Sequence, residues 1–241
     1  MSSARLMDSQ GQNSVAPEFL VSPSLLDVVS PSGDRGGMML GAGMQGEPLT
    51  ISVLRPVPTR MVVVGGLYLA RQIALRAMAT GALIIIATGR PQAWQQIQRA
   101  AGSGPDGRPS PLVQLRRLTP ADLPRPTEDM PLLVVHDGGH VPQELFPPRS
   151  PWQTTMYVLP YLHPQAASTA NTADLVLLQR LPHGQTQLAS QIWRLRPQMA
   201  QQLTTLKDDQ VIALGQDLWR PLRLVTTPGE TQILGQVRRG D

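Results

Sequence analysis

The residue types best suited to chemistry gather in one short segment, where His136 and Asp137 end an apolar run and His140 and Glu144 follow at intervals of four residues. Imidazole and carboxylate groups are common ligands of divalent transition metals. Residues 138–142 have the composition of a loop, so the four-residue spacing does not place these side chains on one helical face. Polar residues in such a loop commonly cap the next element. We therefore expect structural capping and no metal site here, with metal binding as the alternative.

The pair Gly65-Gly66 is a second candidate, because it lies between an apolar run and an amphipathic stretch. Residues 61–64 and 83–87 are continuous apolar runs, as expected of strands in a parallel sheet that is covered on both faces. Between them, apolar residues recur at helical spacing, and Gly81 lies where a helix commonly ends. The resulting order of strand, glycine pair, helix and strand is a βαβ unit, which commonly begins a nucleotide-binding domain.

A phosphate-binding P-loop needs a lysine that reaches the phosphates and a hydroxyl that holds magnesium. The chain contains a single lysine, Lys207, which is far from any predicted strand-to-helix turn. The sequence therefore excludes a P-loop lysine next to Gly65-Gly66.

The dinucleotide fingerprint G-x-G-x-x-G/A is matched in part. Gly65 and Ala70 fit its first and third positions, but Leu67 replaces the middle glycine, where the backbone must approach a pyrophosphate. Arg90 lies near the position of the ribose-binding carboxylate and would suit a 2′-phosphate. The candidate cofactor-binding residues are thus Gly65, Gly66, Ala70 and Arg90, and the competing interpretation is a structural tight turn into a packed helix.

Further elements must position these residues. The patterns predict strands over 51–54, 112–115, 132–135, 154–159 and 175–178, helices over 91–101, 185–195 and 198–206, and a hairpin over 211–214 and 222–226. The alternation of helix and strand predicts an α/β fold with three layers, a mostly parallel sheet, and a C-terminal helical pair and hairpin. Residues 1–49, rich in Ser, Gly, Pro and Met, are expected to form a flexible tail, residues 50–228 the α/β domain, and residues 229–241 a C-terminal tail.

Composition excludes several classes. The chain has no cysteine, which rules out disulfides, thiolate zinc sites and thiol catalysis. The net charge of +4 is mild and the basic residues are scattered, so we expect no direct nucleic-acid binding. No run approaches the roughly 20 apolar residues of a membrane span, and no secretory signal is evident. We expect a cytoplasmic protein that associates with a membrane only through a partner. Trp193 and Trp219 are either core residues or anchors for such a partner.

Two segments resemble the FtsK/HerA-like motor ATPases, which include conjugative coupling proteins and the EccC-type motors of type VII secretion. The segment 69–82, LARQIALRAMATGA, resembles the helix and strand that follow the P-loop in this family. The segment 131–138, PLLVVHDG, resembles the Walker B strand, with Asp137 at the position linked to magnesium. The resemblance covers roughly residues 60–227 and implies a RecA-like, P-loop-like topology.

Three departures from the family change the function that the resemblance implies. The P-loop lysine is missing, Leu67 and Tyr68 stand where a Ser or Thr would hold magnesium, and Gly138 replaces the glutamate that polarises water. The resemblance then implies a non-hydrolysing ATPase-like domain with no catalytic residue, a vestigial Walker B residue in Asp137, and no bound cofactor. Such a domain is expected to act through protein contacts in a secretion or conjugation-type machine, with an active motor ATPase as its expected partner.

Two other hypotheses remain open. The first is an enzyme or sensor with a divergent Rossmann-type dinucleotide site at Gly65, Gly66, Ala70 and Arg90. The second is a regulatory DNA-binding partner, whose binding would fall steeply with salt.

Overall fold

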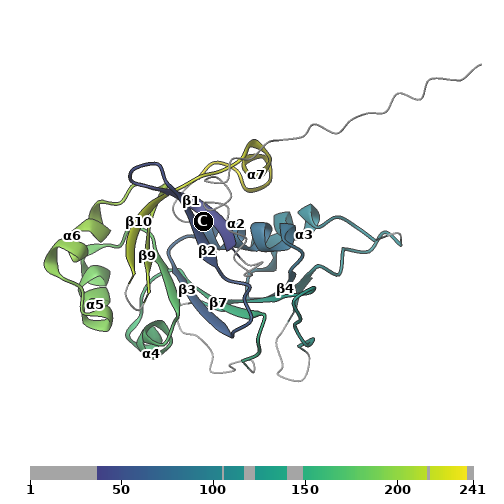
Figure 1. Cartoon of the computed structure of the whole chain (residues 1–241), viewed down its shortest axis with the longest axis horizontal. Helices are drawn as coiled ribbons and strands as arrows, with labels where there is room; N and C mark the ends of the chain where they lie inside the picture. Colours follow the sequence, from purple (N-terminus) through teal and green to yellow (C-terminus); the bar gives the residue numbers. More distant parts are fainter. Residues whose placement is uncertain (1–36, 105, 117–122, 140–148, 216–217, 238–241) are drawn as a thin grey trace, which may run out of the picture. The chain divides into compact units, whose positions relative to one another are not determined.

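The computed structural model describes residues 37–104, 106–116, 123–139, 149–215 and 218–237. Ten strands form one sheet in the order β2-β1-β10-β9-β8-β3-β7-β6-β4-β5 (Figure 1). The strands are β1 (Gly37–Gly43), β2 (Pro48–Ser52), β3 (Thr59–Val64), β4 (Leu83–Thr88), β5 (Val113–Leu115), β6 (Leu132–Asp137), β7 (Gln153–Leu159), β8 (Leu175–Leu178), β9 (Gln210–Leu214) and β10 (Trp219–Leu224). The helices are α2 (Leu67–Ala79), α3 (Gln95–Ala100), α4 (Ala167–Asn171), α5 (His183–Trp193), α6 (Pro197–Thr205) and α7 (Pro228–Leu234), with 3-10 turns η1 (Pro91–Trp94) and η3 (Pro164–Ala166).

The central part of the sheet is parallel, as the apolar runs predict. Strands β8, β3, β7, β6, β4 and β5 all run in one direction, while β9, β10, β1 and β2 continue the sheet with antiparallel pairing. The predicted βαβ unit is β3-α2-β4, with β7 and β6 lying between its two strands. The mixed α/β fold with a mostly parallel sheet is therefore confirmed, as is the closing hairpin, which is formed by β9 and β10.

Helices lie on both faces of the sheet (Figure 1), and alternate residues of the central strands bury against opposite helix layers. Met61 and Val63 of β3 pack in one core with α2, α3 and α7. Val62 and Val64 pack in a second core with α5 and α6. Because both faces of β3 are covered, its sequence is uniformly apolar rather than alternating. None of the helices in the described ranges has the length and the hydrophobicity that a membrane span requires.

The structure places regular elements where the sequence indicated a tail. Strand β1 forms within the segment expected to be flexible, and it buries Met38 and Leu40 while pairing with β10. Glycine at position 41 lets this strand approach β10 closely, because a Cβ there would lie 2.1 Å from the carbonyl oxygen of Arg223. Helix α7 forms within the expected C-terminal tail and begins with a capping box between Thr227 and Glu230.

Arg76 of α2 joins both of these additional elements to the core. Its guanidinium bonds both carboxylate oxygens of Glu230 on α7 and donates to the carbonyl oxygens of Met39 and Val225. Burial alone would raise the pKa of Glu230, but the hydrogen bonds from Arg76 and from the Thr227 amide outweigh burial and lower it. The Glu230 carboxylate is thus ionised and paired, which fixes α7 against α2.

We expect Glu230→Gln to lower the free energy of unfolding by about 2 kcal/mol, because it removes a charge-assisted pair and leaves Arg76 in a largely buried position. Urea denaturation of the full chain measures this difference. Asp106→Asn is the matched control, since the Arg108–Asp106 pair is exposed on both sides and should contribute little. Equal effects of the two substitutions would contradict the role assigned to Glu230.

Candidate functional site

The polar candidates from the sequence lie at the carboxyl ends of the parallel strands. Gly65 follows β3, Asp137 ends β6, and Arg90 comes two residues after β4. Gln179 directly follows β8, which pairs with β3. In open α/β sheets, ligands bind in the crevice outside these strand ends. The chemistry of this edge therefore decides whether the fold can hold a phosphate group.

The glycine turn is closed by a buried side chain. Gly65 has φ of +137°, and its amide donates to the carbonyl oxygen of Leu159 at 2.9 Å. The next amide, that of Gly66, donates to Oε1 of Gln179 at 2.6 Å. Gln179 is 1% exposed, and a Cβ on Gly65 would lie 2.2 Å from the same Oε1 atom. The amide of Gly66 thus bonds an oxygen atom of this protein, in a turn that would otherwise offer it to a phosphate.

The first turn of α2 is apolar and buried. Gly66 is its N-cap residue and supplies no side chain, and the turn has no acidic residue. Leu67 and Tyr68 are 1% and 2% exposed, and Ala70 is fully buried. A helix N-terminus favours anions only where its amides are accessible. At this N-terminus, the residues that follow the glycine pair are buried in the hydrophobic core.

Asp137 accepts hydrogen bonds from three side chains. The Arg90 guanidinium makes a two-pronged contact with it, with nitrogen–oxygen distances of 3.0 to 3.2 Å. The indole Nε1 of Trp94 and the hydroxyl of Thr88 each donate to Oδ2 at 2.8 Å. The Asp137 side chain is 1% exposed, whereas that of Arg90 is 42% exposed. A two-pronged guanidinium–carboxylate contact is among the stronger charged interactions in proteins, so the negative charge of Asp137 is balanced within the chain.

The structure brings together only some of the predicted site residues. Arg90 and Asp137 are in contact, while Gly65 and Gly66 contact Gln179 instead. Three further residues of this edge were not predicted from the sequence, namely Gln179, Trp94 and Thr88. Thr88 could have been predicted, because it begins the polar turn after the second strand of the βαβ unit, at the same sheet edge as Asp137. Nothing local in the sequence places β8 beside β3, so nothing pointed to Gln179.

His136 points away from Asp137. Adjacent strand residues alternate between faces, and His136 stacks on Tyr157 of β7 with ring centroids 4.9 Å apart and an interplanar angle of 16°. Burial lowers the pKa of His136 to about 4, so the ring is neutral near pH 7. His140 and Glu144 lie outside the described residues. Among those that the structure describes, no group of three or more His, Cys, Asp or Glu side chains could hold a metal ion.

No protein-family model matches the chain, and no curated protein matches it in sequence. Among solved structures, VirB4 of Thermoanaerobacter pseudethanolicus is similar, with a TM-score of 0.56 at 8% identity over 82% of this chain and 98% of that chain. The genome packaging NTPase B204 of Sulfolobus turreted icosahedral virus 2, in complex with AMPPCP, has a TM-score of 0.48 at 12% identity over 71% of this chain and 99% of that chain. The cytoplasmic domain of the Thermomonospora curvata type VII secretion ATPase EccC has a TM-score of 0.46 at 10% identity, covering 86% of this chain and 32% of that chain.

The likeness to VirB4 extends over nearly all of that chain and shows the fold. The protein has the mixed α/β fold of P-loop ATPases, with a ten-stranded, mostly parallel sheet. The likeness to VirB4 agrees with the α/β topology that the resemblance of segments 69–82 and 131–138 implies.

We expect Arg90→Ala to lower the free energy of unfolding by about 2 kcal/mol, because the Asp137 carboxylate stays buried without its cation. Arg90→Ala combined with Asp137→Asn should be less harmful than the sum of the two single changes. Urea denaturation of the three variants measures the coupling. Arg180→Ala is the control, since the Arg180–Asp208 pair is exposed and should change stability by less than about 0.5 kcal/mol. Additive effects of the two changes would contradict the pairing.

A pH dependence follows from His136. Between about pH 6.5 and pH 4, the unfolded chain binds a proton that the folded chain excludes, so stability falls as the pH is lowered through this window. The loss should reach about 3 kcal/mol at most. His136→Phe keeps an aromatic ring against Tyr157 and should flatten this part of the stability profile, measured by urea denaturation from pH 7 to pH 4. The exposed His183→Gln should leave the profile unchanged, and a profile that His136→Phe also leaves unchanged would refute the assignment.

Proposed function

We propose that this protein is a non-hydrolysing, ATPase-like component of a secretion or conjugation-type machine and that it acts through protein contacts. Support comes from the P-loop ATPase fold shared with VirB4 and from the sequence resemblance of the Walker-B-like segment. A cytoplasmic location, with membrane association only through a partner, is part of the same proposal.

The observation that carries the proposal is the contact between Arg90 and Asp137. In P-loop NTPases, the aspartate at the end of the Walker B strand helps to hold the magnesium ion that bridges the β- and γ-phosphates. In this chain the Arg90 guanidinium forms an ion pair with the Asp137 carboxylate, and Trp94 and Thr88 each donate to its Oδ2. A magnesium ion at this carboxylate would have to approach a fixed positive charge and displace it. The arrangement therefore favours a closed site over a metal-dependent one.

The phosphate side of the same edge supports this interpretation. Phosphoryl transfer depends on positioning and on positive charge around the γ-phosphate, since the protein does little covalent chemistry. The lysine that would supply this charge is absent, and Gln179 occupies the Gly66 amide. Leu67 and Tyr68 add apolar bulk where a hydroxyl is needed. Both halves of a nucleotide site are thus replaced by internal contacts.

The dinucleotide hypothesis requires the same atoms. Gly66 and Arg90 would have to contact a pyrophosphate and a 2′-phosphate, but each is engaged by Gln179 or Asp137. Ala70 is fully buried in the core, so it adds no space for a pyrophosphate at the turn. This hypothesis therefore remains the second candidate, and binding of NADP that Arg90→Ala weakens would support it.

Phosphate release from ATP by the purified full chain tests the proposal. We expect no turnover above buffer at millimolar Mg-ATP, and none in Arg90→Ala, because freeing Asp137 does not restore the missing lysine. Asp137→Ala is the control for a contaminating ATPase, since it should leave any residual signal unchanged. Magnesium-dependent turnover of about 1 per second or faster, within the usual range of enzymes, that Asp137→Ala abolishes would overturn the proposal.

A further inference from the structure

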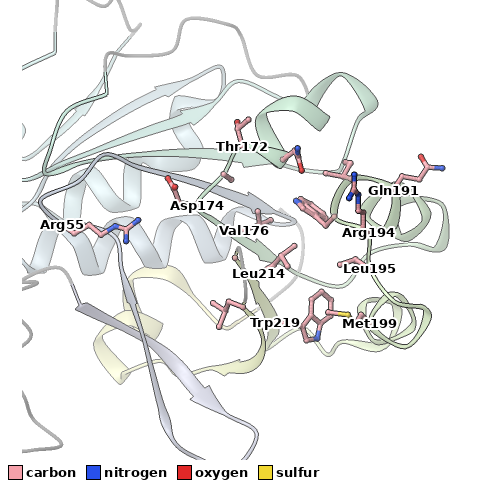
Figure 2. Close-up of a pocket in the computed structure, with 16 residues that line it drawn as sticks. Arg55, Thr172, Asp174, Val176, Gln191, Arg194, Leu195, Met199, Leu214 and Trp219 are labelled. Carbon is pink, nitrogen blue, oxygen red and sulfur yellow. The ribbon is translucent and has the colours of Figure 1, made fainter.

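A large cavity lies at the opposite edge of the sheet from the Gly65-Gly66 turn. It has a volume of about 1060 Å³ and lies among β8, β9 and the ends of α5 and α6. Arg55 precedes β3 and Asp174 precedes β8, so the cavity is at the amino ends of the parallel strands. Its size suits a ligand of drug-like or nucleotide dimensions. Figure 2 shows Arg55 and Asp174 at one end and Arg194, Met199 and Trp219 at the other.

Two tryptophans on the cavity wall are held by their indole nitrogens. Nε1 of Trp193 donates to the carbonyl oxygen of Ala170 at 3.4 Å, and Nε1 of Trp219 donates to Oε1 of Gln202 at 3.1 Å. Both side chains are half-buried and both line the cavity. Both rings also pack against the core that α5 and α6 share with the sheet, so each offers a ligand only the part of its surface that faces the cavity. Fixed indole rings stack well on planar aromatic groups, including nucleobases.

Arg194 lies next to Trp193 in an uncommon backbone conformation. It is the C-cap residue of α5 with φ of +52°, a position at which glycine or asparagine is usual. Strained positions of this kind cluster at functional sites. In the part of the chain that the structure describes, the Arg194 guanidinium makes no ion pair or hydrogen bond, and its side chain is exposed at the cavity. An exposed guanidinium at the rim of a cavity that two tryptophans also line is suited to an anionic group on an aromatic ligand.

The charge of the cavity is positive at its other end as well. Arg55 donates from Nε to the Thr59 hydroxyl at 2.9 Å, and its terminal nitrogens have no hydrogen bond to any residue in the described ranges. Among the described residues that line the cavity, Asp174 is the acidic one, and its Oδ2 accepts the Arg60 amide at 2.6 Å while the Arg60 charge lies nearby. The amide and hydroxyl side chains of Asn171, Thr172 and Gln191 complete a polar lining. Positive charge, polar groups and indole rings together suit a ligand that is anionic and aromatic.

We propose that this cavity binds a nucleoside phosphate, with the base against the indole rings and the phosphates paired with Arg194, while Arg55 closes the far end. This site is separate from the carboxyl edge, where Asp137 and Gly66 are occupied by internal contacts. Binding here needs neither a P-loop nor magnesium, so it is compatible with a chain that does not hydrolyse ATP.

Calorimetric titration of the full chain with ATP in the presence of a chelator tests the proposal, with tryptophan fluorescence as a second readout. We expect saturable binding that Arg194→Ala weakens by roughly tenfold or more, as expected for loss of a charged hydrogen bond. Trp219→Leu should weaken binding of both ATP and adenosine, whereas Arg194→Ala should weaken ATP much more than adenosine. Circular dichroism confirms that each variant is folded.

Two matched controls locate the ligand. Arg196→Ala removes a nearby exposed arginine that does not line the cavity, and it should leave the affinity unchanged. Arg90→Ala alters the opposite edge and should also have no effect. Absence of saturable binding would overturn the inference, as would binding that Arg90→Ala abolishes and Arg194→Ala preserves. Neither result bears on hydrolysis, so this inference and the proposed function can fail separately.

Discussion

The contact between Arg90 and Asp137 is the constraint on which the rest of the carboxyl edge depends. A carboxylate that is 1% exposed is stable in the folded state only if its charge is balanced and its oxygens are bonded. Arg90 supplies the charge, and Thr88 and Trp94 supply the remaining donors. Since these three residues come from the end of β4, from the turn after it and from η1, the ion pair also fixes how the chain leaves the second strand of the βαβ unit.

The same principle explains the glycine turn. A strand-to-helix turn exposes backbone amides that need an acceptor, and a phosphate is one solution. Here the acceptor is the Gln179 side chain, which approaches so closely that only glycine fits at position 65. The glycine that resembles a remnant of a phosphate loop is therefore required by a side chain of the protein. At the glycine turn and at Asp137, a side chain of the protein itself makes the contact that a bound ligand could otherwise make.

The sequence predicted the parts of this structure that depend on local pattern. The apolar runs of β3, β4, β6 and β7 and the amphipathic helix α2 follow from periodicity alone, because each strand is buried on both faces. Strand β1 could not be predicted in this way, since its glycines resemble a linker until the approach of Arg223 is known. The role of Gln179 was equally hidden, because it depends on β8 pairing with a strand more than a hundred residues earlier in the chain.

The two edges of the sheet differ in how their polar groups are satisfied, and this difference bears on function. At the carboxyl edge, the Asp137 carboxylate is bonded to Arg90, Trp94 and Thr88, and the Gly66 amide to Oε1 of Gln179, so a ligand that used these groups would have to break existing contacts before making its own. At the amino edge, Arg194 and the terminal nitrogens of Arg55 have no such contacts among the described residues, so a ligand there would add interactions without displacing any. Binding free energy is reduced by every internal contact that must first be broken. On this argument, a ligand meets fewer existing contacts at the amino edge, where the cavity is open, than at the carboxyl edge.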